Sequence, residues 1–373
     1  MNNMSNMNNM NNTSNISAKK KIMIMAAGTG GHIFPGLAIA QMMQTRGWDV
    51  TWLGTQTGME GAIVKKNGIA IDQLDFTGLR GKGLKHSLIG AFKLVKSFFT
   101  CIALMRKHRP DVVLGMGGYV TVPGGVACAL TGKPLVLMNA DADLLMSNKA
   151  LKIFAKKIIL GLPSKSIQNE AKAEFIGNPI RAEICNLPAP AQRYAQRTGP
   201  LNIVVIGGSL GAKVLNETVP AALALIPEAQ RPHVRHQSGK QHIQALQERY
   251  QELGVHAETL DFIDDMRTCY ADADLVICRA GAITISELTA AGVASVLVPL
   301  VASSTSHQKA NAEWINENQA GIHLPQKEMS AQALADVIQS LTRTRCMEMA
   351  QSAYLLGRRQ ASEDIAHILE NML

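Results

Sequence analysis

The sequence lacks the features of a membrane-spanning protein and those of a protein with a cysteine-rich zinc site. No apolar run reaches the roughly 18–20 residues that a membrane-spanning helix needs. None of the six cysteines forms a C-x-x-C pair, which fits a reducing cytosol and argues against a cysteine-rich zinc site. Residues 1–20 are rich in Asn, Met and Ser and lack the apolar centre of a signal peptide, so we expect a disordered leader.

Acidic residues are missing from one long segment. None occurs between Phe76 and Pro110, whereas residues 80–109 hold eight Lys or Arg. Apolar residues recur there at helical spacing, namely Leu88, Phe92, Val95, Phe99 and Ile102. The pattern predicts a helix that packs this face on the core, while the basic loop at 78–85 faces an anionic membrane or a phosphorylated ligand. The plainer alternative is a solvated basic face.

Charge and length bound the protein class. The net charge of +8 favours an anionic partner such as phosphorylated substrate, lipid or nucleic acid. A chain of 373 residues is longer than most domains with a single hydrophobic core, so two domains are expected. We predict domains at 21–180 and 201–355 and a proline-containing linker at 181–200.

Two internal similarities support this division. Lys21-Ile-Met-Ile and Asn202-Ile-Val-Val each begin a buried strand that opens onto glycines. The strand and glycine turn at 111–118 are matched by those at 274–281. The chain is therefore predicted to be an α/β protein with two similar doubly wound parallel-sheet domains that face each other.

The segment at 275–288 has the pattern of an anion site. A buried strand is followed by a turn at Gly281 and a helix that ends at Gly292. Unpaired amides and the helix dipole at such a start attract phosphate. Glu287, expected as an exposed carboxylate in the first turn, suits the hydroxyls of a ribose beside a diphosphate. An ordinary helix cap is the alternative.

The first glycine turn, Gly28-Thr-Gly-Gly-His32, supplies a candidate catalytic base. A turn at a strand end presents His32 to a cleft, and its ordinary pKa is near 6.5. A turn or diphosphate contact without proton transfer is the alternative. The dinucleotide motif G-x-G-x-x-G needs glycine where Ile33 stands, so an NAD-dependent oxidoreductase is a weaker prediction. A non-enzymatic protein that binds anionic lipid or RNA is the third.

Eight motifs occur in one order: Gly28-Thr-Gly-Gly-His-Ile-Phe-Pro-Gly36, Gly78-Leu-Arg-Gly-Lys-Gly83, Gly115-Met-Gly-Gly-Tyr119, Gly177-Asn-Pro-Ile-Arg181, Gly207-Gly-Ser-Leu-Gly-Ala212, His236-Gln-Ser-Gly239, Phe262-Ile-Asp-Asp265 and Gly281-Ala-Ile-Thr-Ile-Ser-Glu287. From Lys21 to the C-terminal helix the chain thus resembles the MurG family, the bacterial peptidoglycan N-acetylglucosaminyltransferases of glycosyltransferase family 28. The resemblance implies the GT-B fold, in which two Rossmann-like domains face a cleft. It also implies that the last helix, at about 356–373, returns to the first domain.

The resemblance also implies the reaction. The family moves N-acetylglucosamine from UDP-N-acetylglucosamine to the 4-hydroxyl of the muramoyl sugar of undecaprenyl-diphosphate-linked MurNAc-pentapeptide (lipid I). Inversion at the anomeric carbon gives lipid II and UDP for peptidoglycan synthesis and cell division. The enzymes are peripheral on the cytoplasmic face of the bacterial inner membrane. We therefore expect an anionic membrane surface as partner, no nucleic acid and no required cofactor.

Matching positions imply the site residues. Contacts to UDP-N-acetylglucosamine are expected from Thr29, Gly30, Gly31, Asp141, Arg181, Ser209, Ile263, Ala282, Ile283, Thr284, Ile285, Ser286, Glu287 and Gln308. From the basic segment, membrane or acceptor contacts are expected at Arg80, Lys82, Leu84, Lys85 and Leu88.

Asp141 departs from the family pattern. Met138-Asn-Ala-Asp141 stands where the family usually has His-Glu-Gln-Asn, so a carboxylate replaces the asparagine that contacts the donor sugar. The change removes an amide donor and adds charge. Asp141 is the second candidate base. With Asp143 it also forms a D-x-D pair at a strand end, where Mg²⁺ is possible but not required.

Overall fold

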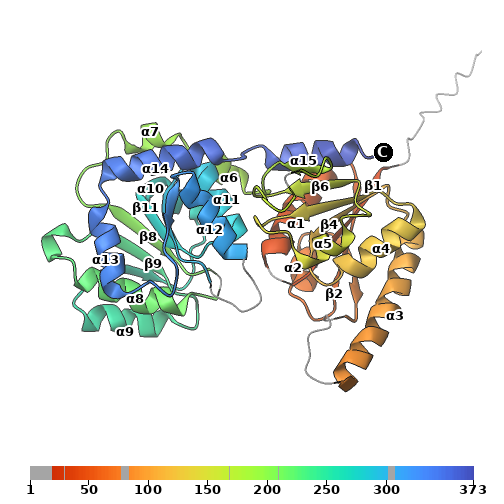
Figure 1. Ribbon diagram of the computed structural model, residues 1–373, viewed down its shortest axis with the longest axis horizontal. Coiled ribbons are helices and arrows are strands. Elements are labelled where there is room, and N and C mark those ends of the chain that lie inside the picture. The colour runs from red at the N-terminus through yellow and green to blue at the C-terminus, as the bar shows by residue number, and fades with distance from the viewer. Residues whose placement is uncertain (1–18, 29, 77–83, 168, 209, 301–306) are drawn as a thin grey trace, which may run out of the picture.

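The computed structural model describes residues 19–28, 30–76, 84–167, 169–208, 210–300 and 307–373, with only the backbone described at 84–91. Two α/β domains lie side by side along the long axis of the molecule (Figure 1). The predicted leader falls almost wholly outside the described residues, as do Thr29, Ser209, Arg80 and Lys82. The side chains of Leu84, Lys85 and Leu88 are likewise not described.

The first domain is built on a seven-stranded parallel sheet with the order β3-β2-β1-β4-β5-β6-β7. Its strands are β1 (Lys21–Ala26), β2 (Asp49–Thr55), β3 (Ala70–Leu74), β4 (Val112–Gly117), β5 (Leu135–Asn139), β6 (Lys157–Leu160) and β7 (Ala173–Phe175). Its helices are α1 (Gly30–Thr45), α2 (Glu60–Lys66), α3 (Leu84–His108), α4 (Thr121–Thr131) and α5 (Met146–Leu151). The central strands are apolar runs because helices cover both faces.

The second domain repeats this arrangement in a six-stranded parallel sheet with the order β10-β9-β8-β11-β12-β13. Its strands are β8 (Asn202–Ile206), β9 (His233–Gln237), β10 (Glu258–Leu260), β11 (Leu275–Cys278), β12 (Ala294–Leu297) and β13 (Gly321–His323). Its helices are α8 (Lys213–Ala224), α9 (Ile243–Glu252), α10 (Met266–Asp272), α11 (Ala282–Ala291), α12 (His307–Glu317), α13 (Ala331–Ser340) and α14 (Arg343–Leu356), with a 3₁₀ turn at Glu228–Gln230.

Both sheets reverse their strand order beside the first strand, between β1 and β4 and between β8 and β11. In open parallel sheets ligands bind outside the carboxyl ends of the strands at such a reversal. The predicted fold, two doubly wound Rossmann-like domains, is therefore confirmed, and each domain offers one binding edge.

The chain crosses between the domains twice. Two short helices, α6 (Ala182–Cys185) and α7 (Pro190–Tyr194), occupy the first crossing. At the second, α14 lies over the second domain, whereas α15 (Ala361–Glu370) lies over the first (Figure 1). Ile365, Ala366 and Leu369 of α15 belong to the first domain's core. Arg46, directly after α1, pairs with Glu370 at 2.7 Å and also with Glu363.

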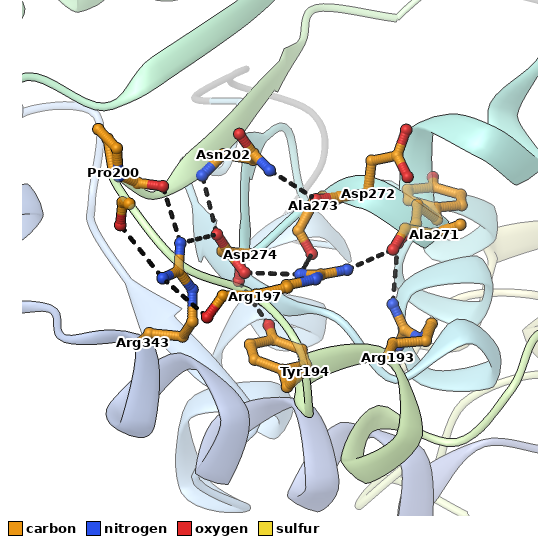
Figure 2. A network of polar contacts seen from close by, with 12 residues as sticks. Arg193, Tyr194, Arg197, Pro200, Asn202, Ala271, Asp272, Ala273, Asp274 and Arg343 are labelled. Atoms are coloured by element: carbon orange, nitrogen blue, oxygen red, sulfur yellow. Dashed lines mark hydrogen bonds and ion pairs between the residues drawn. The ribbon is translucent and has the colours of Figure 1, made fainter.

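A buried carboxylate fastens these connecting segments to the second sheet. Asp274, at the start of β11, is fully buried and accepts hydrogen bonds from Arg197 at 2.6 Å and Arg343 at 3.2 Å (Figure 2). It also accepts from the backbone N–H of Asn202 at 2.9 Å, and the hydroxyl of Tyr194 donates to its carbonyl at 2.9 Å. The network lies at the amino end of the strand, away from the binding edge.

The outward face of α3 differs from the prediction. Phe92 and Phe99 are 72% and 63% exposed, and Val95 is also exposed, whereas Cys101 and Met105 are buried. The expectation that the face with Phe92, Val95 and Phe99 packs on the core was wrong, because the helix carries a second apolar stripe that packs inward instead. No helix in the described part of the chain is long and apolar enough to cross a membrane.

Candidate active site

The binding edges of the two sheets meet at two adjoining cavities. The first, of about 970 Å³, is lined by Gly30 and Gly31 from the first domain and by Gln308 from the second. The second, of about 1010 Å³, is lined by Arg181 from the segment between the domains and by Ile263 from the second domain. The cavities share five lining residues, namely Phe34, Ile206, Gly208, Ile283 and Thr284. Together they form one interdomain cleft.

The start of α11 points an anion site into this cleft. Gly281 precedes the helix, and its carbonyl accepts from the amide of Ile285 at 3.0 Å. The amides of Ala282, Ile283 and Thr284 therefore have no partner within the helix. Ile283 and Thr284 line both cavities. These unpaired donors, together with the helix dipole, favour a bound diphosphate.

Two residues of the same segment face away from the cleft. The Ile285 side chain is fully buried in the second domain's core. The Ser286 hydroxyl donates to the carbonyl of Ala282 at 2.9 Å and accepts from Asn178 at 2.9 Å. Their side chains thus hold the helix in place, and the cleft-facing part of the predicted segment is shorter than the motif.

Glu287 lies beside the second cavity, with its side chain 13% exposed. One carboxylate oxygen accepts from Arg181 at 3.0 Å, and the other accepts from the hydroxyl of Tyr270 at 3.0 Å. Burial raises the pKa of Glu287, and both partners act against that rise. The expectation of an exposed first-turn carboxylate was wrong: the helix begins at Ala282, so Glu287 falls in its second turn against Tyr270.

A glycine loop after β8 also lines the first cavity. Gly211 has a φ of +77°, and a Cβ there would lie 1.9 Å from the carbonyl oxygen of Ser238. Only glycine fits there, so the loop packs directly against the backbone at Ser238. Gln308, at the start of α12, accepts from the amide of Leu300 at 2.8 Å. Its side-chain oxygen is therefore fixed at the cavity wall.

His32 lies in the first turn of α1, directly after Gly30 and Gly31. A Cβ built on Gly117 would lie 3.2 Å from its Nε2, so the ring packs against that turn. Its buried Nδ1 has no hydrogen-bond partner among the described residues. Burial lowers the pKa of His32, and the charge of Asp141 counteracts this shift. Neither His32 nor Asp141 is among the residues that line the two cavities.

Sequence reasoning missed several residues of the cleft. Arg279 lines the first cavity and donates to the carbonyl of Val298 at 3.1 Å and to Gln326 at 2.8 Å. Its place at the end of β11, two residues before Gly281, was a usable signal because strand ends carry ligand contacts. Phe34 lines both cavities and is 57% exposed. The sequence carried no signal for Phe34, because its position in a predicted helix does not distinguish it from an ordinary exposed aromatic residue.

Metal ligands are not gathered in the part of the chain that the structure describes. No group of three or more His, Cys, Asp or Glu side chains is placed to hold an ion there. One oxygen of Asp141, the candidate Mg²⁺ ligand, accepts a hydrogen bond from Asn311 at 2.8 Å. All six cysteines are free thiols.

Two Rossmann-like domains whose binding edges meet at one cleft have the architecture of the GT-B glycosyltransferases. Comparison with known protein families supports this class. The sequence profile of the glycosyltransferase family 28 N-terminal domain matches residues 22–160, and that of its C-terminal domain matches residues 202–367. The chain belongs to glycosyltransferase family 28, as its motifs predicted.

Individual relatives are similar over nearly their whole length. A protein of Herminiimonas arsenicoxydans is 61% identical over 354 residues, covering 95% of this chain and 99% of the relative. One from Chromobacterium violaceum is 53% identical, with coverage of 95% and 99%. Both are named UDP-N-acetylglucosamine–N-acetylmuramyl-(pentapeptide) pyrophosphoryl-undecaprenol N-acetylglucosamine transferase. The crystal structure of Acinetobacter baumannii MurG superposes with a TM-score of 0.83 at 36% identity, covering 94% of this chain and 99% of that one.

Proposed function

We propose that this chain transfers N-acetylglucosamine from UDP-N-acetylglucosamine to the 4-hydroxyl of the muramoyl sugar of undecaprenyl-diphosphate-linked MurNAc-pentapeptide. The products are lipid II and UDP. The observation that carries the proposal is the start of α11, where unpaired amides and Glu287 face one cleft. The names of relatives that span nearly the whole chain support the same reaction.

The donor is held mainly by the second domain. The amides of Ala282, Ile283 and Thr284 bind the diphosphate, while Glu287 accepts the ribose hydroxyls. The backbone of Ile263 holds uracil, Arg181 lies against the nucleotide, and Gln308 contacts the sugar. Gly30 and Gly31 form the facing wall. Thr29, which belongs to the same facing wall, and Ser209, which contacts a donor phosphate, lie outside the described residues.

The chemistry is a direct displacement. The acceptor 4-oxygen forms a bond to the anomeric carbon as the bond from that carbon to the UDP oxygen breaks, which inverts the centre. Negative charge grows on the diphosphate, where the fixed amides of α11 stabilise it; such preorganisation is usually the largest catalytic contribution. His32 takes the acceptor proton, since its lowered pKa keeps the ring neutral at neutral pH. Asp141 is the second candidate for that role.

We also propose that the enzyme works as a peripheral protein at the cytoplasmic membrane face, with α3 as its contact. Phe92, Val95 and Phe99 project from α3 into solvent, and Lys96 is exposed beside them. Leu130 of α4, which packs beside α3, is 67% exposed. Apolar side chains among lysines suit the surface of an anionic leaflet. The basic residues Arg80, Lys82 and Lys85 adjoin this face in the sequence.

One assay tests the reaction. The chain is incubated with UDP-N-acetylglucosamine and a short-chain, water-soluble lipid I analogue, and mass spectrometry follows the acceptor. We expect the mass of one added N-acetylhexosamine and one equivalent of UDP. A reaction without acceptor controls for hydrolysis of the donor. A folded chain that binds UDP but transfers no sugar would contradict the proposal. Tight NADH binding without UDP binding would favour the oxidoreductase instead.

A further inference from the structure

The loop after β5, residues 140–145, is held by buried asparagines that the reaction above does not use. Within the first domain, the side-chain amide of Asn139 donates to the carbonyls of Asp141 at 2.7 Å and Asp143 at 3.0 Å. Its oxygen accepts from Asn148 at 3.1 Å and from the amide of Leu145 at 2.9 Å. Both asparagines are fully buried. The loop therefore has a fixed shape within its own domain.

The crossing segment holds the same loop. Asn178, 1% exposed, donates to the carbonyl of Ala140 at 3.0 Å and to the hydroxyl of Ser286 in α11 at 2.9 Å. One amide group therefore joins the first domain's loop to the donor-binding helix of the second domain.

Asn311 makes the direct contact across the cleft. It belongs to α12 of the second domain and is fully buried. Its oxygen accepts from the amide of Ala142 at 2.8 Å. Its nitrogen donates to the Asp141 carboxylate at 2.8 Å and to the carbonyl of Ala280, in its own domain, at 3.0 Å. Two of its three hydrogen bonds thus reach the first domain, and one of them is to a charged group.

Asn311 and Asp141 are each connected to a group that the proposed reaction uses. Gln308, three residues before Asn311 on α12, lines the first cavity. Asp141 is the charged group that acts on His32 in the described chain. A hydrogen bond to a carboxylate is roughly twice as strong as one between neutral groups, so Asn311 has a clear preference for one position of Asp141. If the domains separate, that donor is lost.

We propose that Asn311 is a positioning residue of the second domain, which fixes the Asp141 carboxylate through a hydrogen bond between the domains, and that this fixed charge acts on His32. The inference rests on the proposed function, in which His32 accepts the acceptor proton. The hydrogen bond from Asn311 exists only while the two domains are in contact, so Asp141 is held in this position only in that arrangement.

The test compares Asn311→Ala, Asp141→Ala and the double variant in transfer to the water-soluble acceptor. We expect kcat to fall about 10–100-fold in each single variant, as misplacement near a reacting centre does, with UDP affinity changed less than about threefold. The double variant should be no slower than the slower single variant, because both act through one link. In each case the acid limb of kcat should move to lower pH, because His32 loses the carboxylate that raises its pKa.

Lys165→Ala is the matched control. Lys165 pairs with Glu317 at 2.8 Å, so this variant removes a different interdomain contact of α12, one that is exposed to solvent. Exposed pairs contribute little to stability, and we expect kcat to change less than about twofold. An equal loss in Lys165→Ala would mean that any contact of α12 matters, and the specific role of Asn311 would be overturned.

A charge exchange keeps the test valid if Asn311→Ala does not fold. Asn311→Asp keeps the shape of the side chain but sets two carboxylates against each other, and should lower kcat. Adding Asp141→Asn removes that repulsion but leaves no carboxylate at position 141 to act on His32, so kcat should not recover and the acid limb should stay at lower pH. Additive losses in Asn311→Ala and Asp141→Ala, an unmoved acid limb, or recovery of kcat in the exchanged pair overturn the role of Asn311 alone. Absence of transfer by the unsubstituted chain overturns the proposed function as well, so the two failures are distinguishable.

Discussion

Arg181, in the segment that joins the domains, donates a hydrogen bond of 3.0 Å to Glu287, which lines the second cavity. The joining segment and the proposed ribose contact are therefore in direct contact. We expect a nucleotide that engages Glu287 to change what Arg181 binds, which would link binding to the position of the domains.

Glu287→Ala should weaken UDP binding by about 1.5–3 kcal/mol, the range for a hydrogen bond to a charged group. Calorimetry of the folded variant measures it. The control is Glu183→Ala, which removes the other, exposed partner of Arg181 at 3.6 Å and should leave UDP affinity nearly unchanged. Equal UDP affinity in Glu287→Ala and the unsubstituted chain would remove Glu287 from the site.

UDP affinity should also depend on pH through Glu287. Its pKa is raised by burial, so on acidification it gains a proton at a higher pH than an ordinary glutamate. The protonated group is a poorer acceptor for ribose hydroxyls, and UDP affinity should therefore rise with pH through that raised pKa and then level off. Calorimetry at several pH values measures the slope. In Glu287→Gln the same slope should be absent; a persistent slope would assign it to another group.

His32→Ala should lower kcat by roughly 10²–10⁴-fold with little change in UDP affinity, if His32 is the base. Because burial lowers the pKa of His32, the acid limb of kcat in the unsubstituted chain should lie below the ordinary value of 6.5. Steady-state rates over a pH series test both statements. A loss confined to the donor KM would make His32 a binding residue.

The sequence predicted the fold well because its signals are local. Four apolar residues at 275–278 and the glycines at 281 and 292 specify a strand, a turn and a helix without help from distant residues. The strand β11 has the predicted bounds and α11 ends before Gly292 as predicted, although it begins at Ala282, earlier than expected. The two sheets follow from repetition of that unit. The family and its reaction followed from motifs in a fixed order.

Burial and long-range contacts were harder to predict. Glu287 looked like an exposed carboxylate because its partner Tyr270 is 17 residues away on another helix. The core-facing side of α3 was assigned wrongly because both sides of that helix carry apolar residues. The helical spacing of apolar residues alone does not say which side packs against the core. Asn311 and Asp141 are 170 residues apart, so only the folded chain brings them together.

The exposed face of α3 should govern membrane binding. Replacing Phe92, Val95 and Phe99 with Ser removes apolar surface that now faces water, so the fold should persist while binding to anionic vesicles weakens. Vesicle co-sedimentation and KM for a long-chain lipid acceptor measure the loss. Turnover of the water-soluble acceptor is the internal control and should be spared.

The basic residues that precede that face in the sequence make a separate prediction. Neutralising Arg80, Lys82 and Lys85 should lower vesicle binding by about 1 kcal/mol per charge, and added salt should reduce the difference. Equal loss of activity with the long-chain and the short-chain acceptor would place these charges in the catalytic cleft. No change with either would leave them as a solvated face.

Asp274 should be essential to stability and irrelevant to the chemistry. Asp274→Asn removes the buried charge that Arg197 and Arg343 share and should cost about 3–5 kcal/mol of unfolding free energy. Urea unfolding measures it. Glu348→Gln breaks an exposed pair with Arg345 and should cost about 0–1 kcal/mol. Similar losses in the two variants would show that the buried network contributes no more than a surface pair.

The return of α15 to the first domain has a consequence for synthesis of the chain. Domains generally fold as units, N-terminal first, while the ribosome is still working. Here Ile365, Ala366 and Leu369 complete the core formed by β1, β4 and α1, but they are translated only after the whole second domain. The domain that is made first is thus the last to be finished, and its apolar surface under α15 stays uncovered until translation nears the end of this sequence.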